Sequence, residues 1–406
     1  MWLTSFKPPL IHHLWACNLI RCTLFQWDPS TEQLAIPKNC SSFRRYFFKF
    51  QLFSHLAYAL LVAAKIGLGK DPLAAKCQGV VFLGISFVLL MPRWHLKAIN
   101  EPCQSLNAFL TFEKTLQKNG PLPPPSLEDK ILVVFLKLLE TSVVVVPLMV
   151  IAIQLHNPCA VPFFGSMSPF CQDGVWTAPP LHIWVSMLCV EYWLWLHIVY
   201  DGTFFVFYTF FVAVVCMLDY LKHVGRLIEA LRIQKNDDHA DFEDQDDRTT
   251  RIRHVFHTYR CVQLLDRILN SALKGELVPA IIGLVPQIQV FSLFVCIRLS
   301  SKIPFPGVLL FPLILTDASV VNFVVNTLAA AVNTNSSNLL VDLNQELRGF
   351  SVRSSFRKEL KASRPTKIQF GQNFVDKGTP LVIENFCFNQ TVSLLLLHSR
   401  TLKKVG

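Results

Sequence analysis

The sequence is poor in charge for its length. Only 16% of its 406 residues are charged, whereas 52% are hydrophobic and 33 are Phe. Because a typical soluble domain has about 25% charged residues, this composition excludes an ordinary soluble protein. Acidic residues are the scarcer kind, and the net charge is +10 at pH 7. In so apolar a chain, the basic excess indicates loops that face a lipid bilayer, not a nucleic-acid surface.

The sequence also lacks the motifs of enzymes. It contains no Walker loop, zinc signature, nucleophile elbow or set of kinase motifs. An acidic run at 237–247 has neither the glycine nor the terminal glutamate spacing of a calcium loop, so it is interpreted as a solvated loop. We therefore expect no enzyme activity, no metal and no cofactor.

Seven apolar stretches are candidates to cross a membrane, because a hydrocarbon core about 30 Å thick needs ~20 helical residues. They cover 50–68, 77–94, 131–155, 183–218, 277–299, 304–332 and 380–398. The fourth stretch would form roughly 54 Å of helix, so one end should project beyond the bilayer. The alternative is two spans with a turn at Asp201 and Gly202.

Basic residues are distributed unevenly around these stretches. Of the 38 Lys and Arg residues, 29 lie in four alternate segments, beginning with the segment before the first stretch. Because basic residues resist translocation, these four segments are predicted to be cytosolic. The expected fold is an all-α plasma-membrane protein with seven transmembrane helices, a cytosolic N-terminus and an extracellular C-terminus.

Five regions are expected along the chain. They are a cytosolic segment at 1–49, six transmembrane helices with a cytosolic helical loop (219–276) at 50–333, cytosolic helices at 334–378, a last transmembrane helix at 379–399 and an extracellular tail at 400–406. Within 334–378, apolar residues recur at helical spacing at Leu339, Leu343, Leu347 and Phe350, and SSFRKELKASRP is typical of a second helix. A single chain is not expected to bury the apolar faces of all these cytosolic helices, so an oligomer is expected.

Two of the 12 cysteines, Cys159 and Cys171, lie in the predicted extracellular loop before the fourth span. The extracellular environment permits oxidation. Cys159 and Cys171 are therefore expected either to form a disulfide or to remain free thiols. Glycosylation sequons occur at Asn39, Asn335 and Asn389. The predicted topology places them in the cytosol or within a span, so none is expected to be modified.

Polar and aromatic side chains inside the spans are candidates for a binding site, because a charged residue at the bilayer centre costs up to ~3 kcal/mol. One helical face of the fourth span carries Trp184, Leu188, Glu191, Tyr192 and Trp195. This face favours an aromatic pocket for a small organic ligand, with Glu191 as its polar anchor. An interfacial aromatic belt is the alternative. Gln287 in the fifth span is a further candidate, and Asp317 is a polar residue of the sixth.

The last span combines polar side chains with a block of leucines at 394–397. The polar residues are Asn385, Asn389, Gln390, Thr391 and Ser393. Hydroxyls and amides can replace the hydration of an ion, and a ring of leucines can close a pore by dewetting. The pattern is therefore typical of a helix that lines a symmetric pore. A helix that forms hydrogen bonds to its own neighbours would contain the same residues.

Two segments near the end of the chain, KASRPTKIQFG at 361–371 and TVSLLLLHS at 391–399, resemble the gustatory-receptor branch of the arthropod gustatory and odorant receptor superfamily. That family's signature is Thr-Tyr, five apolar residues and Gln-Phe. Here TVSLLLLHS keeps Thr391, has Val392 in place of the Tyr, and has His398 and Ser399 in place of Gln-Phe. The segment KASRPTKIQFG at 361–371 is similar to the family's join between its last cytosolic helix and its final membrane helix. The length and the expected topology match as well.

The resemblance implies a chemosensory receptor that is a ligand-gated, nonselective cation channel, opened by a small tastant or odorant. It implies a homotetramer, or a heterotetramer with a related receptor, in which the last helix of each subunit lines a central pore. It also implies a ligand pocket among spans two to six. By position, the pore face comprises Thr391, Leu394, Leu395 and His398.

Two other classes have seven or more spans. A G-protein-coupled receptor has its N-terminus outside, and this sequence has neither an Asp-Arg-Tyr at the third span nor an Asn-Pro-x-x-Tyr in the seventh. A transporter commonly shows an internal repeat with matched broken helices, and no repeat is evident. Both classes are therefore less favoured than the channel.

Overall fold

A computed structural model describes residues 2–37, 41–94, 100–118, 127–172, 174–236, 244–303, 305, 307–349 and 355–405. These residues are mostly helical, which confirms the predicted all-α class. Strands occur among them as three antiparallel pairs: β1 (Gln26–Asp28) with β2 (Gln33–Ala35), β3 (Cys171–Gln172) with β4 (Val175–Trp176), and β5 (Gln369–Phe370) with β6 (Asn373–Phe374).

Six helices in the described part of the chain are long and apolar enough to cross a membrane. They are α2 (Ser42–Leu68), α3 (Leu73–Leu90) with the short η1 (Met91–Arg93), α7 (Leu181–Thr203) through α8 (Ala213–Asn236), α10 (Leu277–Phe294) through η4 (Ser300–Lys302), α11 (Gly307–Val320) through α12 (Asn326–Glu346), and α14 (Thr379–Val405). They coincide with six of the seven predicted spans. The remaining one coincides with α5 (Leu127–His156), whose described apolar part, Thr141–His156, is shorter. A multi-pass membrane protein is therefore supported, and the count of seven stays a prediction.

The fourth predicted span lies in the longest helix. α7 (Leu181–Thr203), the π-helical η2 (Phe204–Val212) and α8 (Ala213–Asn236) form one rod, of which 53 residues, Leu181–Ile233, count as a candidate span. At ~1.5 Å per residue this is roughly 80 Å, so one end projects far beyond a bilayer, as predicted. No turn occurs at Asp201 and Gly202. A side chain at Gly202 would meet Leu89 Cδ2 of α3 at 2.5 Å, so this glycine permits close helix packing.

The sixth predicted span is also part of a longer helix. α11 (Gly307–Val320), η5 (Val321–Val325, π-helical) and α12 (Asn326–Glu346) continue for 40 residues before η6 (Leu347–Gly349). The helix thus continues past 332, where the predicted span ends, because the polar stretch that follows contains neither Gly nor Pro. The predicted apolar stripe is confirmed at Leu343 and Leu347, which are buried on the side where α12 packs against α8. Phe350 lies outside the described residues.

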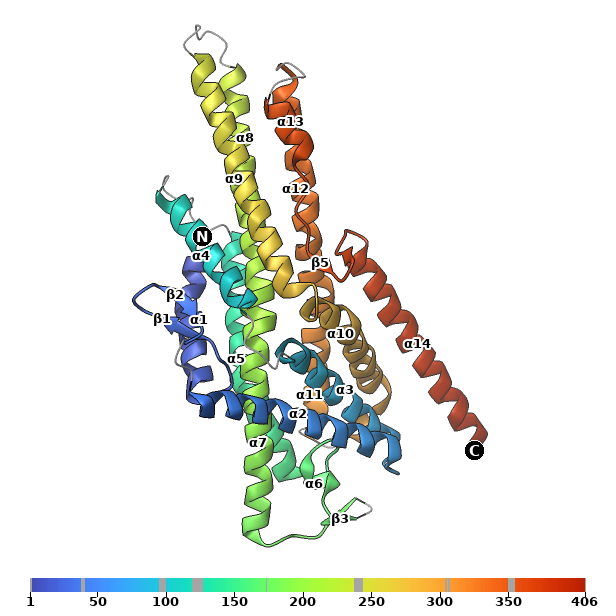
Figure 1. Ribbon diagram of the computed structural model, residues 1–406. Coiled ribbons are helices and arrows are strands. Elements are labelled where there is room, and N and C mark those ends of the chain that lie inside the picture. The colour runs from blue at the N-terminus through green and yellow to red at the C-terminus, as the bar shows by residue number, and fades with distance from the viewer. Residues whose placement is uncertain are drawn as a thin grey trace.

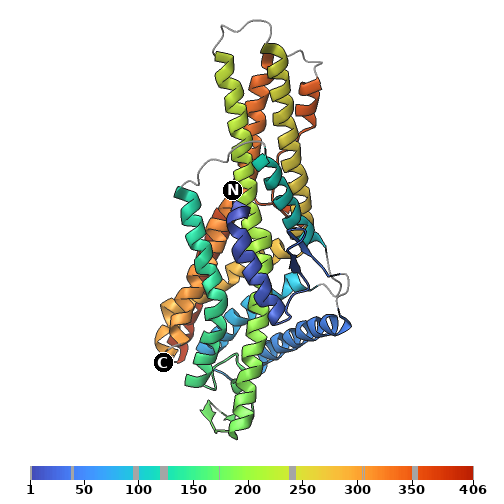
Figure 2. The same ribbon diagram turned by 90° about the vertical axis from the view of Figure 1, so that its left-hand side faces the viewer.

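A second helical layer surrounds the projecting ends of α8 and α12. α9 (Asp244–Leu273) packs against α8 and α4 (Glu101–Lys118), and α13 (Ser355–Ala362), a predicted helix, packs against α12. Figure 1 and Figure 2 show α8, α9, α12 and α13 extending to the top of the molecule, which we call the α9 end. The acidic run begins in the gap before α9, and most of it lies outside the described side chains.

Two helices were not predicted from the sequence. α1 (Trp2–Leu19) buries Phe6, Leu10 and Leu14 against the rest of the core, and α4 buries Leu106 and Phe109. Both lie in segments that were interpreted only as cytosolic loops, because neither is apolar enough to span a membrane. Tertiary packing therefore decides their helical state.

The opposite end of the molecule carries the loop between α5 and α7. This loop contains α6 (Phe164–Met167), β3 and β4, and a disulfide joins Cys159 to Cys171 with Cα atoms 5.7 Å apart. We call it the disulfide end. In Figure 1 the C-terminal end of α14 points toward this end, whereas α13 lies at the α9 end. The chain thus enters α14 from the side of the α9 end.

Candidate ligand cavity and pore helix

A cavity of about 270 Å³ lies among the membrane-type helices. Its walls come from α3, α5, α7 with η2, α10, and α11 with η5. Apolar side chains from all of these helices surround the space, among them Phe82, Val199, Phe207 and Ile288. The volume is near the lower end of the ~300–1,000 Å³ of typical ligand pockets, so the cavity suits a small molecule.

Two π-helical segments contribute to the wall. Phe207, Phe210 and Phe211 come from η2, and Val321 and Val325 come from η5. A π-helix adds a residue to a turn and shifts the side chains that follow, and such segments are frequent at functional sites. The sequence shows no signal for them, because their residues are ordinary apolar ones.

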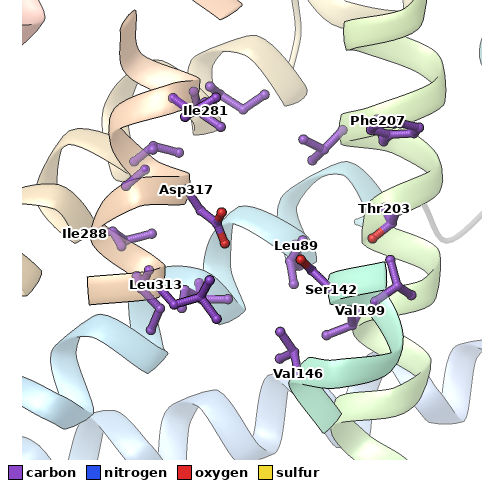
Figure 3. A pocket seen from close by; sticks show the side chains of 18 of the residues that line it. Leu89, Ser142, Val146, Val199, Thr203, Phe207, Ile281, Ile288, Leu313 and Asp317 are labelled. Atoms are coloured by element: carbon purple, nitrogen blue, oxygen red, sulfur yellow. The ribbon is translucent and has the colours of Figure 1, made fainter. Parts of the chain in front are cut away.

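Few polar groups reach the cavity. Among its described lining residues, Asp317 of α11 is the one ionisable side chain, and hydroxyls come from Ser142 of α5 and Thr203 of α7. Figure 3 shows the Asp317 carboxylate projecting from α11 into the cavity, with Ser142 and Thr203 on the opposite side. Asp317 was noted in the sequence only as a polar residue of the sixth span.

The predicted ligand residues are only partly brought together. Trp195 lines the cavity, but Trp184, Leu188, Glu191, Tyr192 and Gln287 are not among its described lining residues. Trp184 packs on Trp176 with ring centroids 4.8 Å apart, and Gln287 is exposed on α10. The single helical face that the sequence suggested therefore extends from the loop at the disulfide end to the cavity wall.

Glu191 is held by the protein itself. It is fully buried and accepts hydrogen bonds from the Tyr58 hydroxyl at 2.6 Å, the Phe164 backbone N–H at 2.8 Å and Trp195 Nε1 at 3.1 Å. These donors belong to α2, α6 and α7. Glu191 thus joins three elements, and its oxygens are directed at them.

The last helix, α14, is the least covered of the six candidate spans. Of its most apolar stretch, 22% is buried, against 89% for the Leu181–Ile233 rod. Figure 1 shows α14 at the edge of the molecule. Large apolar side chains are exposed along it, among them Leu381, Val382, Phe388, Leu396 and Leu397.

The residues predicted for the pore face lie toward their own subunit. Thr391 is 3% exposed and donates a hydrogen bond to the Cys387 carbonyl. Leu394 and Leu395 pack against the core, and the His398 ring meets the Phe294 ring edge-on with centroids 5.9 Å apart.

The opposite side of α14 faces outward. It carries the exposed Asn385, Asn389, Ser393 and Leu396 at helical spacing. Asn389 donates to Asn385 Oδ1 at 3.2 Å, and the Ser393 hydroxyl donates to the Asn389 carbonyl at 2.8 Å. A polar stripe followed by leucine is therefore directed away from the subunit.

A polar bridge connects α14 to the cavity wall. Gln289 of α10 donates to Glu384 Oε2 of α14 at 2.9 Å and accepts from Asn322 Nδ2 of η5 at 2.5 Å. The neighbours of Asn322 and Gln289, Val321 and Ile288, line the cavity. The cavity wall and α14 are thus joined by one chain of hydrogen bonds, in which Gln289 and Asn322 are buried and Glu384 is partly buried. Gln287, the residue predicted from the sequence, lies two positions away on the exposed side of α10, because spacing alone does not reveal which face of a helix is buried.

The segment that leads into α14 is held by α9. Gln263 donates to the Arg364 carbonyl at 2.6 Å, and Asn270 donates to the Lys367 carbonyl and accepts from the Gln369 N–H, both at 2.8 Å. Asp266 accepts from the Lys367 N–H at 3.2 Å, and its burial raises its pKa to about 7. This is the segment whose sequence resembles the family's join.

A buried ion pair stabilises the middle of the bundle. Arg93, at the end of α3, lies with its Nε 2.5 Å from Asp201 Oδ2 of α7, and both side chains are at most 1% exposed. Arg93 also donates to the Cys22 carbonyl at 3.3 Å and lies over the Phe48 ring. The pair thus connects α3, α7 and α2 with the segment after α1. Within the described residues, no cluster of three His, Cys, Asp or Glu is arranged to hold a metal.

No family model matches the chain, and no curated protein matches its sequence. A solved structure does match in three dimensions: the insect olfactory receptor OR5 from Machilis hrabei, with a TM-score of 0.57 and 13% sequence identity over 97% of this chain and 99% of that chain. The match covers nearly the whole of both chains, so the architecture is shared from end to end. The resemblance expected from the sequence is therefore confirmed at the level of the fold.

Proposed function

We propose that this chain is a chemosensory receptor of the arthropod gustatory and odorant receptor superfamily, acting in the plasma membrane as a ligand-gated, nonselective cation channel. The observation that carries the proposal is the exposure of α14 in a chain with the fold of an insect olfactory receptor. An apolar helix that is only 22% buried needs neighbours, and copies of the same chain supply them in a closed symmetric ring. The tetramer follows from the family resemblance.

The outward face of α14 would line the pore. Asn385, Asn389 and Ser393 offer amide and hydroxyl groups that replace ion hydration, and Leu396 lies beyond them toward the disulfide end. No carboxylate lies on this face within the described part of α14, since Glu384 is turned toward Gln289. Weak selectivity among cations is the expected consequence.

The cavity would bind the stimulus, a small tastant or odorant. A ligand there contacts η5 and α10, and the Asn322–Gln289–Glu384 hydrogen bonds run from these elements to α14. A ligand that binds more tightly when α14 is displaced shifts the population toward the open channel. The leucines then move apart, the pore wets and cations pass.

The proposal is tested by whole-cell recording from heterologous cells that express this chain and are exposed to a panel of tastants and odorants. The Leu396→Ala variant should open more readily or leak, because it removes an outward apolar group from the pore. Leu394→Ala, two residues away on the inward face, is the matched control and should leave the pore properties unchanged. A ligand-evoked current altered only by Leu394→Ala would contradict this pore face, and current that requires G-proteins would contradict the channel.

A further inference from the structure

The cavity has an uneven distribution of charge. Its described lining is apolar on every wall except for Ser142, Thr203 and Asp317, and no Lys, Arg or His is among the lining residues. Asp317 takes part in no hydrogen bond or ion pair with any residue that the structure describes, although it is only partly exposed. The nearest elements thus leave one acidic group in an apolar space.

The basic side chains of the neighbouring helices are occupied elsewhere or distant. Arg93, at the end of α3, is paired with Asp201. On α5 the described basic side chain is the exposed Lys137, which lies before Ser142, the first lining residue of that helix, and α7 with η2 contains no Lys or Arg. On α10 and η3 (Val295–Leu299), the basic residue is Arg298, which lies beyond the lining positions. Within the residues that the structure describes, Asp317 therefore has no basic partner.

A carboxylate in an apolar cavity is costly when it lacks a compensating partner, and it interacts with a cation more strongly there than in water. A neutral ligand would leave that cost in place. A ligand with an ammonium group and a small apolar body would remove it, because the ammonium bonds to the carboxylate while the body fills the space lined by Phe207, Val199 and Ile288.

We propose that the cavity selects small primary amines with an apolar or aromatic body, and that Asp317 binds their ammonium group. The hydroxyls of Ser142 and Thr203, across the cavity in Figure 3, are placed to contact polar atoms on the far side of the ligand. This inference rests on the proposed function for its physiological meaning. The binding preference itself depends only on the cavity.

A direct binding measurement tests the preference for amines separately from the proposed channel function. The full chain, purified in lipid nanodiscs, is titrated with radiolabelled 2-phenylethylamine, and the uncharged 2-phenylethanol is used as a competitor of similar shape. The amine should bind at least ~30-fold more tightly than the alcohol, the change expected when a desolvated charge pair is completed. Asp317→Asn should remove most of that preference and leave the alcohol's affinity within about threefold of its original value.

Thr316→Val is the matched control, because Thr316 is adjacent on the same helix and its hydroxyl donates to the Pro312 carbonyl. It should retain the amine preference. Thermal unfolding of each variant verifies that the protein remains folded. Equal affinity for amine and alcohol, no amine binding up to about 1 mM, or an unchanged amine preference in Asp317→Asn would overturn the inference.

Recording from cells then tests the function independently. Amine binding without any evoked current would leave the binding preference standing and contradict the ligand-gated channel. Current evoked by uncharged ligands alone, in a protein that does not bind the amine, would support the channel and overturn the amine selectivity.

Discussion

The Leu181–Ile233 rod and α14 are both apolar helices, but their surroundings are opposite. The rod is 89% buried over its most apolar stretch and contacts helices on several sides, whereas α14 is 22% buried and packs mainly on α10. The rod is specified by contacts within one chain. The outer surface of α14 is not, so its environment must come from lipid, from water or from other copies of the chain.

The largest effect is expected where the rod is most tightly held. Asp201→Ala leaves the guanidinium of Arg93 buried without its anion, which should cost about 3–5 kcal/mol of stability. The loss is measured as a lower unfolding temperature of the purified protein, or as loss of folded protein from the membrane. If Asp201→Ala is as stable as a variant on the exposed face of α14, the rod is not held more tightly than α14.

Asp266 of α9, which binds the segment leading into α14, should make the stability of the protein depend on pH. Burial raises the pKa of Asp266 from 3.8 to about 7, so the folded state holds this proton more tightly than the unfolded state does. The free energy of unfolding should therefore fall by roughly 4 kcal/mol as the pH rises from about 4 to 7, and it should level off above that range. Asp266→Asn should reduce this slope, and an unchanged slope in the variant would exclude Asp266 as its origin.

Coupling between the cavity and α14 should depend on Gln289. In Gln289→Leu, both Glu384 and Asn322 lose a hydrogen-bond partner. Because allosteric coupling energies are typically about 1–3 kcal/mol, the ligand-evoked current should need roughly 5–150-fold more ligand. Gln287→Leu, on the exposed side of α10, is the control. The bridge is not the coupling element if both variants respond equally.

The smallest effect on stability is expected on the outward face of α14. Leu396 is 56% exposed, so Leu396→Ala should change the unfolding free energy of the subunit by no more than about 0.5 kcal/mol. The same substitution is expected to alter the current. A large loss of subunit stability would mean that Leu396 packs within its own chain.

The two helices also differ in how far the sequence predicts them. Hydropathy and the distribution of Lys and Arg suffice to find both, because these depend on composition. The projection of the rod beyond a bilayer was predicted from the apolar stretch 183–218, but its full length to Ile233 was not, because the stretch after Leu218 is polar. The inward placement of Thr391 and His398 was not predicted, because an amphipathic pattern in a membrane does not reveal which face meets protein.

The cavity illustrates the same limit. Trp195 was predicted as a ligand residue, and it lines the cavity. Phe82, Phe207 and Ile288 also line the cavity, but they come from separate helices and no local sequence pattern identifies them. Glu191 was a reasonable anchor by spacing, but its oxygens bind donors from the distant Tyr58 and Phe164. Asp317 was visible as a polar residue, and only the packing of five walls shows that it faces a cavity. Long-range contacts thus decide the site.

The most direct test of the account is cysteine modification of α14 during ligand-evoked current. Ser393→Cys and Leu394→Cys place a thiol on adjacent residues that face outward and inward, respectively. A membrane-impermeant thiol reagent applied from outside should block the current irreversibly in Ser393→Cys and leave Leu394→Cys and the unmodified chain unaffected. Block of Leu394→Cys alone, or of neither variant, would contradict the claim that the exposed face of α14 lines the ion pathway.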